Sequence, residues 1–299
     1  MKTPKLLISL FIGLLFMVSC SQDDTTPTIT EDDNTEDPIE EEGDDEEEIP
    51  TEPNSLKSFT VDKNGDLYSF YFHYDNNKID KLAYVNKLDE ITYYSFDYNN
   101  TERIQETTKY TANPNNTSVD FSNSNNFSNA ESSLTHSYHT NNKLQEIAGF
   151  GYAYTNGLVD QIMSTTMFPT TNIFYDANNK IEKTETYLDN HDTGSPRYFE
   201  FDNQTNPFYK LFDEFGFVVD RNLSIPDSGF ITSDINRILK DLYCISPYNI
   251  DQKRDENNYP SYNVEYTYND DDYPLEGVFT GEIEGQQEII LYTISYDYY

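Results

Sequence analysis

The feature that most restricts the fold of this 299-residue chain is an aromatic pattern that recurs from residue 71 onward. Each copy has alternating aromatic residues, a short group of Asn or Asp, and a second stretch that alternates again. A period of two is typical of strands with one buried face, and Asn and Asp favour tight turns. The pattern therefore predicts consecutive β-hairpins. The clearest copies are YFHYDNNKIDKLAYV (71–85), YYSFDYNNTERIQETTKY (93–110), LTHSYHTNNKLQEIAGF (134–150), FGYAYTNGLVDQIMST (150–165) and NIFYDANNKIEKTETYL (172–188).

Hairpins that follow one another along the chain build an antiparallel meander. One face would carry the Tyr, Phe and aliphatic residues, and the other would carry Thr, Ser, Glu and Lys. The dipeptides Asn64-Gly65 and Asn156-Gly157 are the strongest signals for two-residue hairpin turns. The expected fold class is mainly β, an antiparallel meander that forms an open sheet or a sandwich-like arrangement.

Two stretches have a helical period instead. In 206–216, Phe208, Leu211, Phe212 and Phe215 recur at helical spacing, between a proline at the start and a glycine at the end. In 232–244 the same spacing relates Ile235, Ile238, Leu239 and Leu242. Both amphipathic segments are expected to be short helices packed on the open face of the sheet.

The amino terminus has the features of an export signal. Lys2 and Lys5 precede an apolar run over 6–18, which is too short to cross a bilayer core, and Ser19 is the small residue before a presumed cut. Cys20 follows directly, and this resembles a bacterial lipobox in which the cysteine is lipidated. An ordinary soluble secretory signal is the alternative. We therefore expect residues 1–19 to be a lipoprotein signal peptide and Cys20 to carry the anchor.

The segment that follows is acidic. Residues 20–55 contain 16 Asp and Glu and no Lys or Arg, so low hydrophobicity and charge repulsion predict a disordered, extended tether. The remaining 56–299 is expected to be a single Tyr-rich β domain. The whole chain has a formal net charge of −35. A chain without a basic face is not suited to bind nucleic acid or anionic lipid, so membrane attachment would come through the acyl anchor.

Motifs for catalysis or cofactor binding are absent from the sequence. There is no G-x-S-x-G, H-E-x-x-H, P-loop or G-x-G-x-x-G, and we expect no cofactor. Cys244 is interpreted as a small buried hydrophobe. His136 and His139 are three residues apart on an expected strand and would not chelate one metal, and His73 and His191 stand apart from them. The Asp-rich turns 62–66 and 269–272 resemble calcium loops, but ordinary turn chemistry explains them, so no metal site is expected.

The hairpins, together with TNPFYKLF, SPYNI (246–250), YTYNDDDYPLEG (266–277) and the closing YTISYDYY (292–299), resemble a family. They are similar to uncharacterised Bacteroidetes surface lipoproteins with YD (RHS-like) repeat-type hairpins. The resemblance implies a secreted, surface-tethered β protein and brings no activity with it. It also implies that Gln22, Asp23 and Asp24, directly after the cysteine, act as an export signal to the outer face.

The expected function is that of a lipid-anchored cell-surface protein of unknown activity that acts as a non-catalytic binding or structural module. It would be attached to the outer membrane and face the exterior, with the periplasmic face as the alternative. One alternative function is a glycan-binding accessory of a polysaccharide-uptake system, which predicts a row of solvent-facing Tyr. The other is a secreted carbohydrate- or peptide-active enzyme. A glycan or a surface protein is the expected partner.

Overall fold

The computed structural model describes residues 54–110, 117–147, 149–164, 170–188, 191–192, 196–217, 239, 242–282 and 288–299. All of them belong to one compact unit, Asp45–Tyr299. The first strands are β1 Leu56–Lys63, β2 Asp66–Asp75, β3 Lys78–Val85, β4 Ile91–Tyr98, β5 Ile104–Tyr110, β6 Ala130–Tyr138, β7 Leu144–Ile147, β8 Phe150–Thr155 and β9 Leu158–Ser164. They are followed by β10 Thr170–Tyr175, β11 Ile181–Leu188, β12 His191–Asp192, β13 Arg197–Thr205, β14 Tyr248–Arg254, β15 Pro260–Tyr268, β16 Pro274–Gly281 and β17 Ile289–Tyr298.

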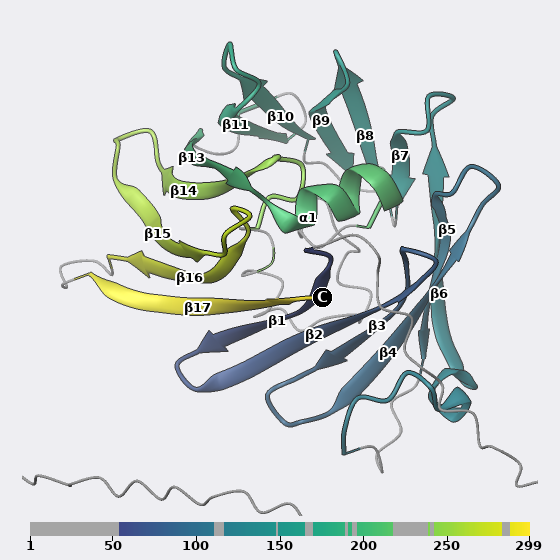
Figure 1. Ribbon diagram of the computed structural model, residues 1–299. Coiled ribbons are helices and arrows are strands. Elements are labelled where there is room, and N and C mark those ends of the chain that lie inside the picture. Colours follow the sequence, from purple (N-terminus) through teal and green to yellow (C-terminus); the bar gives the residue numbers. More distant parts are fainter. Residues whose placement is uncertain are drawn as a thin grey trace, which may run out of the picture. The chain divides into compact units, whose positions relative to one another are not determined.

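The strands form a closed barrel (Figure 1). Apart from the two-residue β12, each strand pairs antiparallel with the next along the chain, and β1 pairs with both β2 and β17, so the first and last strands complete the ring. The two-residue β12 pairs with β11, which also pairs with β13. Sixteen strands therefore make up the wall of the barrel.

The predicted open sheet or sandwich was wrong. A sheet whose Tyr-rich face is continuous over all its strands must cover that face, and here it does so by curling until β1 meets β17. Six hairpins bend at a β-bulge beside the tyrosine that precedes the turn, and such bulges increase strand twist and curvature. These tyrosines are Tyr74, Tyr98, Tyr138, Tyr154, Tyr175 and Tyr268.

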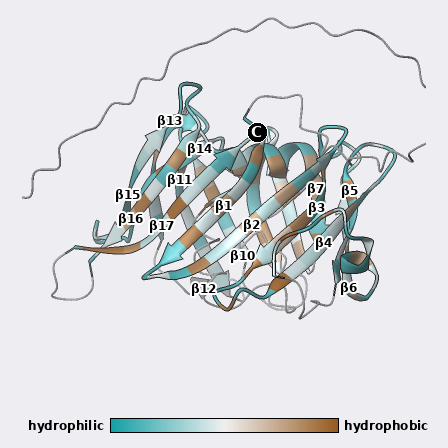
Figure 2. Cartoon of the chain, turned by 60° about the horizontal axis from the view of Figure 1, so that its bottom comes forward, coloured by the Kyte–Doolittle hydropathy of each residue, from teal (hydrophilic) through white to brown (hydrophobic). Residues whose placement is uncertain are grey.

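Apolar side chains point into the barrel. On neighbouring strands Phe59 stacks on Phe70 with ring centroids 4.5 Å apart, and Phe279 stacks on Tyr292 at 4.4 Å. Many outer positions are polar, and an apolar cluster of Ala83, Ile91 and Tyr93 lies on the outer side of β3 and β4. A row across five consecutive strands of the outer wall contains Thr267, Glu276, Ser295, Thr60 and Ser69. Figure 2 shows the resulting alternation of hydrophilic and hydrophobic residues along the strands.

A helical insertion between β13 and β14 occupies the lumen (Figure 1). It consists of α1 Pro207–Lys210 and the π-helical turn η2 Leu211–Phe215. Asn206 caps its start by accepting a hydrogen bond from the Phe208 N–H, and Gly216 ends it in the left-handed conformation (φ 75°). The predicted helix over 206–216 is thus present, but short. Of the predicted helix over 232–244, most lies outside the described residues.

This insertion packs against strands from around the ring. We call residues 206–217, 239 and 242–246 the plug. Its aromatic contacts reach β1 and β17 through Phe208, β2 and β4 through Phe217, and β8 through Phe212. Cys244 is fully buried in the same core, which confirms its interpretation as a small hydrophobe. A barrel of this size encloses more space than wall side chains fill, and the plug supplies the rest of the core.

Candidate functional site: two clefts beside the β8–β9 hairpin

The residues predicted to carry lipid and export information, Cys20, Gln22, Asp23 and Asp24, lie outside the described residues. Their roles stay predictions. The described part of the chain offers four other places where function could reside. These are the plug contacts in the lumen, a buried histidine, a His–Asp pair on the outer wall, and two clefts beside one hairpin.

The turns of the repeated hairpins share one construction. The first loop residue is Asn or Asp in many of them, and its side-chain oxygen accepts backbone N–H groups two and four residues later, as in Asn99 and Asp176. The fourth loop residue adopts positive φ, which Asn and Asp tolerate better than other non-glycine residues. These residues include Asp89 (59°), Glu102 (63°), Asn142 (61°), Asn179 (63°), Asn258 (65°) and Asp272 (64°). The Asn-rich repeats are therefore explained by turn chemistry.

The tyrosine before the turn links one hairpin to the previous one. Its hydroxyl donates to the backbone carbonyl oxygen of a residue in the preceding pair of strands, at 2.6–2.9 Å. We call this bond a tyrosine latch. The latches join Tyr74 to Leu56, Tyr98 to Ile79, Tyr138 to Ile104, Tyr175 to Val159 and Tyr298 to Pro274. Two of these tyrosines differ: Tyr268 donates to the Asp202 carboxylate, and the buried hydroxyl of Tyr154 has no hydrogen-bond partner within the described residues.

Two basic side chains hold the end of the plug. The Arg103 guanidinium donates to the carbonyl oxygens of Asp213 and Glu214, and its carbon lies 5.2 Å from the Tyr138 ring centroid. Lys143 pairs with the Asp213 carboxylate. Burial raises the pKa of Tyr138 to about 12, an effect that the nearby Arg103 charge opposes. Cations at a helix C-terminus stabilise its exposed carbonyls, so these contacts have a structural role.

His136 is the second candidate. It points into the barrel from β6, its Nε2 lies 2.8 Å from Thr107 Oγ1, and its Nδ1 has no partner within the described part of the chain. Burial, aided by the Arg103 charge, lowers the pKa of His136 to about 4. The imidazole is therefore neutral at physiological pH, and its environment is that of a core side chain.

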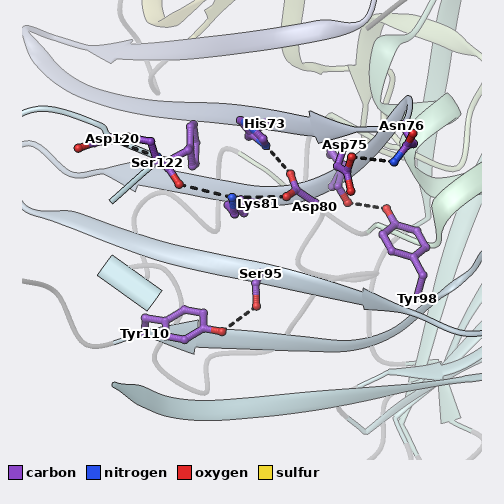
Figure 3. Close-up of polar contacts among 12 residues, drawn as sticks. His73, Asp75, Asn76, Asp80, Lys81, Ser95, Tyr98, Tyr110, Asp120 and Ser122 are labelled. Atoms are coloured by element: carbon purple, nitrogen blue, oxygen red, sulfur yellow. Dashed lines mark hydrogen bonds and ion pairs between the residues drawn. The ribbon is translucent and has the colours of Figure 1, made fainter. Parts of the chain in front are cut away.

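The outer wall of β2–β5 carries the third candidate (Figure 3). His73 Nδ1 lies 2.5 Å from Asp80 Oδ1, and the His73 ring packs 5.3 Å from Phe121. Residues 117–129, which include the 3-10 turn η1 Ser124–Phe127, cover this wall; we call them the outer flap. A His–Asp pair also occurs in nucleophilic catalysis, where the other imidazole nitrogen contacts a hydroxyl. Within the described residues no such contact to His73 is present, and Ser95 bonds Tyr110 instead.

The β8–β9 hairpin separates from the strands on both sides, and a cleft opens at each separation. Toward β10, only Gln161–Met163 pair with Thr170–Asn172, and beyond Asn172 the strands diverge. The cleft there has a volume of about 530 Å3 and is lined by Asp160, Gln161, Asn172 and Phe174 among others. We call it the β9–β10 cleft.

A second cleft opens toward β7, because β7 and β8 pair only at Glu146–Gly151 and Ile147–Phe150. It has a volume of about 580 Å3, and its lining includes Gln145, Gly151 and Ala153. His139 Nε2 lies 3.1 Å from the Tyr152 carbonyl oxygen, which has no β7 residue opposite it in the strand pairing. The missing latch of Tyr154 lies at the same divergence of β7 and β8.

Neither cleft was found from the sequence. The glycan alternative predicted a row of exposed tyrosines, and this was wrong, since within the described residues Tyr259 is the one tyrosine among the exposed large hydrophobic side chains. The small outward residues Gly151 and Ala153 are the signal that could have indicated a recess. They alternate with inward aromatic residues and place no bulky side chain on the outer side of β8.

The described residues contain no group of three or more His, Cys, Asp or Glu side chains that could hold a metal ion. They also contain no helix that is long and apolar enough to cross a membrane. Neither observation bears on the residues before Asn54, where the anchor is predicted.

No protein-family model matches the chain. No curated protein matches it either. Two similar solved structures are a porin-like protein from Bacteroides uniformis (12% identity, TM-score 0.36, 84% of this chain and 99% of that one) and a porin-like protein from Bacteroides vulgatus (11% identity, TM-score 0.37, 82% and 99%).

Proposed function

We propose that this chain is a lipid-anchored protein of the outer cell surface whose folded part is a plugged, water-facing β-barrel that acts as a non-catalytic binding module. The observation that carries the proposal is the distribution of polarity across the barrel wall. Polar residues such as Thr60, Glu276 and Ser295 face outward, while the lumen holds a packed aromatic core.

Barrels that span a membrane have the opposite arrangement. Their outer surface is an apolar band, and the lumen of a channel is polar and filled with water. A charged side chain on a lipid-facing wall is destabilising, by about 2–4 kcal/mol for Lys or Arg near the bilayer centre and by less for a glutamate such as Glu276. The polar wall of this barrel is suited to water and not to lipid. A barrel of this kind would be held at the membrane by the acyl anchor at Cys20, with the acidic segment 20–55 as the connection.

The binding role is supported by where surface irregularities lie. Most of the wall is regular and closed by paired strands and latches, and the two clefts interrupt it on either side of a single hairpin. The resemblance to YD-type surface lipoproteins supports the cell-surface location. Within the described residues the outward-facing His73–Asp80 pair contacts no nucleophile, which favours binding over catalysis.

The test replaces residues 1–20 with an ordinary cleavable secretory signal that contains no lipobox cysteine. The exported chain should then appear in the soluble fraction without detergent, whereas the native chain should stay with the membranes. Cys244→Ser is the matched control, because it removes the other cysteine and should leave membrane attachment unchanged. Membrane retention of the signal-replaced chain would show that the barrel itself is embedded, and the proposal would be wrong.

A further inference from the structure

We infer that the β9–β10 cleft binds a neutral saccharide, with a sugar ring against Phe174 and sugar hydroxyls on the polar side chains beside it. This inference rests on the proposed binding role and names the class of ligand. It depends on three observations, which are the exposed ring, the hydrogen-bonding groups and the charge of the cleft.

The Phe174 ring is exposed in the cleft and held in place by a neighbouring lysine. Phe174 lies on the outer face of β10, is 37% exposed and lines the cleft. The Lys183 Nζ lies 4.5 Å from its ring centroid and so covers one face. Lys183 is itself held by Glu185 at 2.6 Å. The opposite face is left for a ligand, and a fixed apolar ring is a suitable surface for the C–H face of a sugar ring.

The floor of the cleft is built from polar groups that are already oriented. Gln161 Nε2 donates to Asn172 Oδ1 at 2.8 Å, where the paired part of β9 and β10 ends. This bond leaves amide donors and acceptors on both residues for other partners. The Tyr175 latch to the Val159 carbonyl, at 2.6 Å, holds the diverging strands together from the inner side. The cleft is therefore rigid at its base and open to solvent.

Asp160 provides an acceptor with a defined orientation. It is the extra residue of the bulge opposite Tyr154 and Ala153, which turns its side chain to the outer wall. The Thr155 hydroxyl donates to Asp160 Oδ2 at 2.6 Å, and this oxygen can accept a second hydrogen bond, whereas Oδ1 is buried and has no partner within the described residues. A carboxylate oxygen that accepts from a sugar hydroxyl makes a stronger hydrogen bond than a neutral acceptor does.

Charge selects against acidic ligands. The Lys183 charge is paired with Glu185, so Asp160 leaves the cleft with a negative charge. Residues 56–299 carry 38 acidic and 17 basic side chains, which adds long-range repulsion of anions. A neutral polyhydroxylated ring fits the amide groups, the carboxylate and the open aromatic face of this cleft. A phosphate, a nucleic acid or an acidic polysaccharide does not.

The test is affinity electrophoresis of the full mature chain from residue 20, carrying Cys20→Ser, in native gels that contain one soluble polysaccharide each. The probes are a β-glucan, an α-mannan, a xylan and a galactan, with polygalacturonate as the anionic comparison. At least one neutral polymer should slow the chain. Phe174→Ala should weaken that interaction about tenfold or more, and Asp160→Asn should weaken it while leaving the fold unchanged by circular dichroism.

The matched control is Tyr259→Ala, because Tyr259 is an exposed aromatic residue outside the cleft, 68% exposed at the β14–β15 turn. It should bind like the unmodified chain. The inference is overturned if no neutral polymer slows the chain, if only polygalacturonate does, or if Phe174→Ala and Tyr259→Ala behave alike. The signal-replacement test above uses no ligand, so the two tests are independent. A chain that is soluble without its anchor but binds none of the polymers would contradict the saccharide site and still support the anchoring proposal.

Discussion

The hydroxyl group of Tyr98 donates a hydrogen bond of 2.6 Å to the backbone carbonyl oxygen of Ile79, the residue that pairs with Tyr74 in the preceding hairpin. The same relation connects Tyr138 with Ile104, which pairs with Tyr98. Several hairpins are thus fastened to the one before by a tyrosine at the same place in the sequence, whereas the Tyr154 hairpin is not. This explains why the recurring pattern keeps a tyrosine, and not a phenylalanine, directly before the turn.

We predict that Tyr98→Phe lowers the free energy of unfolding by about 1–2 kcal/mol. The substitution keeps the ring and its contact with Lys78 but removes the donor to a part-buried carbonyl. The matched comparison is Tyr154→Phe, whose hydroxyl has no partner within the described residues and whose loss should change stability by less than about 0.5 kcal/mol. Urea unfolding followed by circular dichroism measures both, and equal effects would contradict the role of the latch.

Removing the cation that holds the plug should have a larger effect. Arg103 is 8% exposed and donates to carbonyl oxygens at the end of η2, so Arg103→Met leaves those carbonyls without their partner. The expected loss is about 2–4 kcal/mol. Lys57→Met is the control, because Lys57 is exposed and 3.7 Å from Asp297, and it should cost less than about 1 kcal/mol. Similar values for the two variants in denaturant unfolding would show that the Arg103 contacts contribute little.

Acid should destabilise the barrel through His136. Burial depresses the pKa of this residue to about 4 in the folded chain, against an ordinary value of 6.5. Between these values the unfolded chain binds a proton that the folded chain does not, so stability falls as the pH drops from 6.5 toward 4. The largest loss of stability that this shift can cause is about 3 kcal/mol. None of it is felt above pH 6.5, and all of it is felt below pH 4.

The measurement is the free energy of unfolding at pH 7, 6 and 5 for the native chain and for His136→Gln. The variant should have a flatter profile over this range, because it has no group with the shifted pKa. Parallel profiles would place the acid sensitivity elsewhere, and His136 would then titrate alike in the folded and unfolded chain.

The left-handed turn positions provide a test of local strain. Asp89 is exposed with φ 59°, so Asp89→Val should cost about 1–2 kcal/mol, because a β-branched residue is disfavoured there. Asp89→Gly should be neutral or slightly stabilising. Leu88→Val, at the neighbouring exposed position, should change stability by less than about 0.5 kcal/mol. Thermal unfolding of the three variants checks this order, and a harmless Asp89→Val would contradict it.

Local structure could be predicted well from particular residues. Asn64-Gly65 and Asn156-Gly157 form two-residue turns in which both residues have positive φ, as the dipeptides predict. The Phe208, Leu211, Phe212 and Phe215 spacing gave the correct buried helical face. These features depend on residues within a few positions of one another, and so their signal is contained in a short window of sequence.

The clefts could not be predicted in this way. Asp160 and Phe174 are on different hairpins, and they line one recess because β9 and β10 pair over three residues and then diverge. The length of that pairing depends on bulges in both hairpins and on the latch between them. A sequence pattern shows that each hairpin exists but not how far neighbouring hairpins remain joined.

The sequence by itself determined the hairpins, their turns and the face that each strand buries, because these follow from local backbone preferences and from the alternation of polar and apolar residues. The anchor at Cys20 stays a prediction. Only the tertiary structure decided that the sheet closes. The pairing of Phe59 with Tyr296 joins residues from opposite ends of the folded chain, and no local signal specifies it. Closure turns the aromatic face inward around the plug, because that is how a continuous apolar face over so many strands is removed from water.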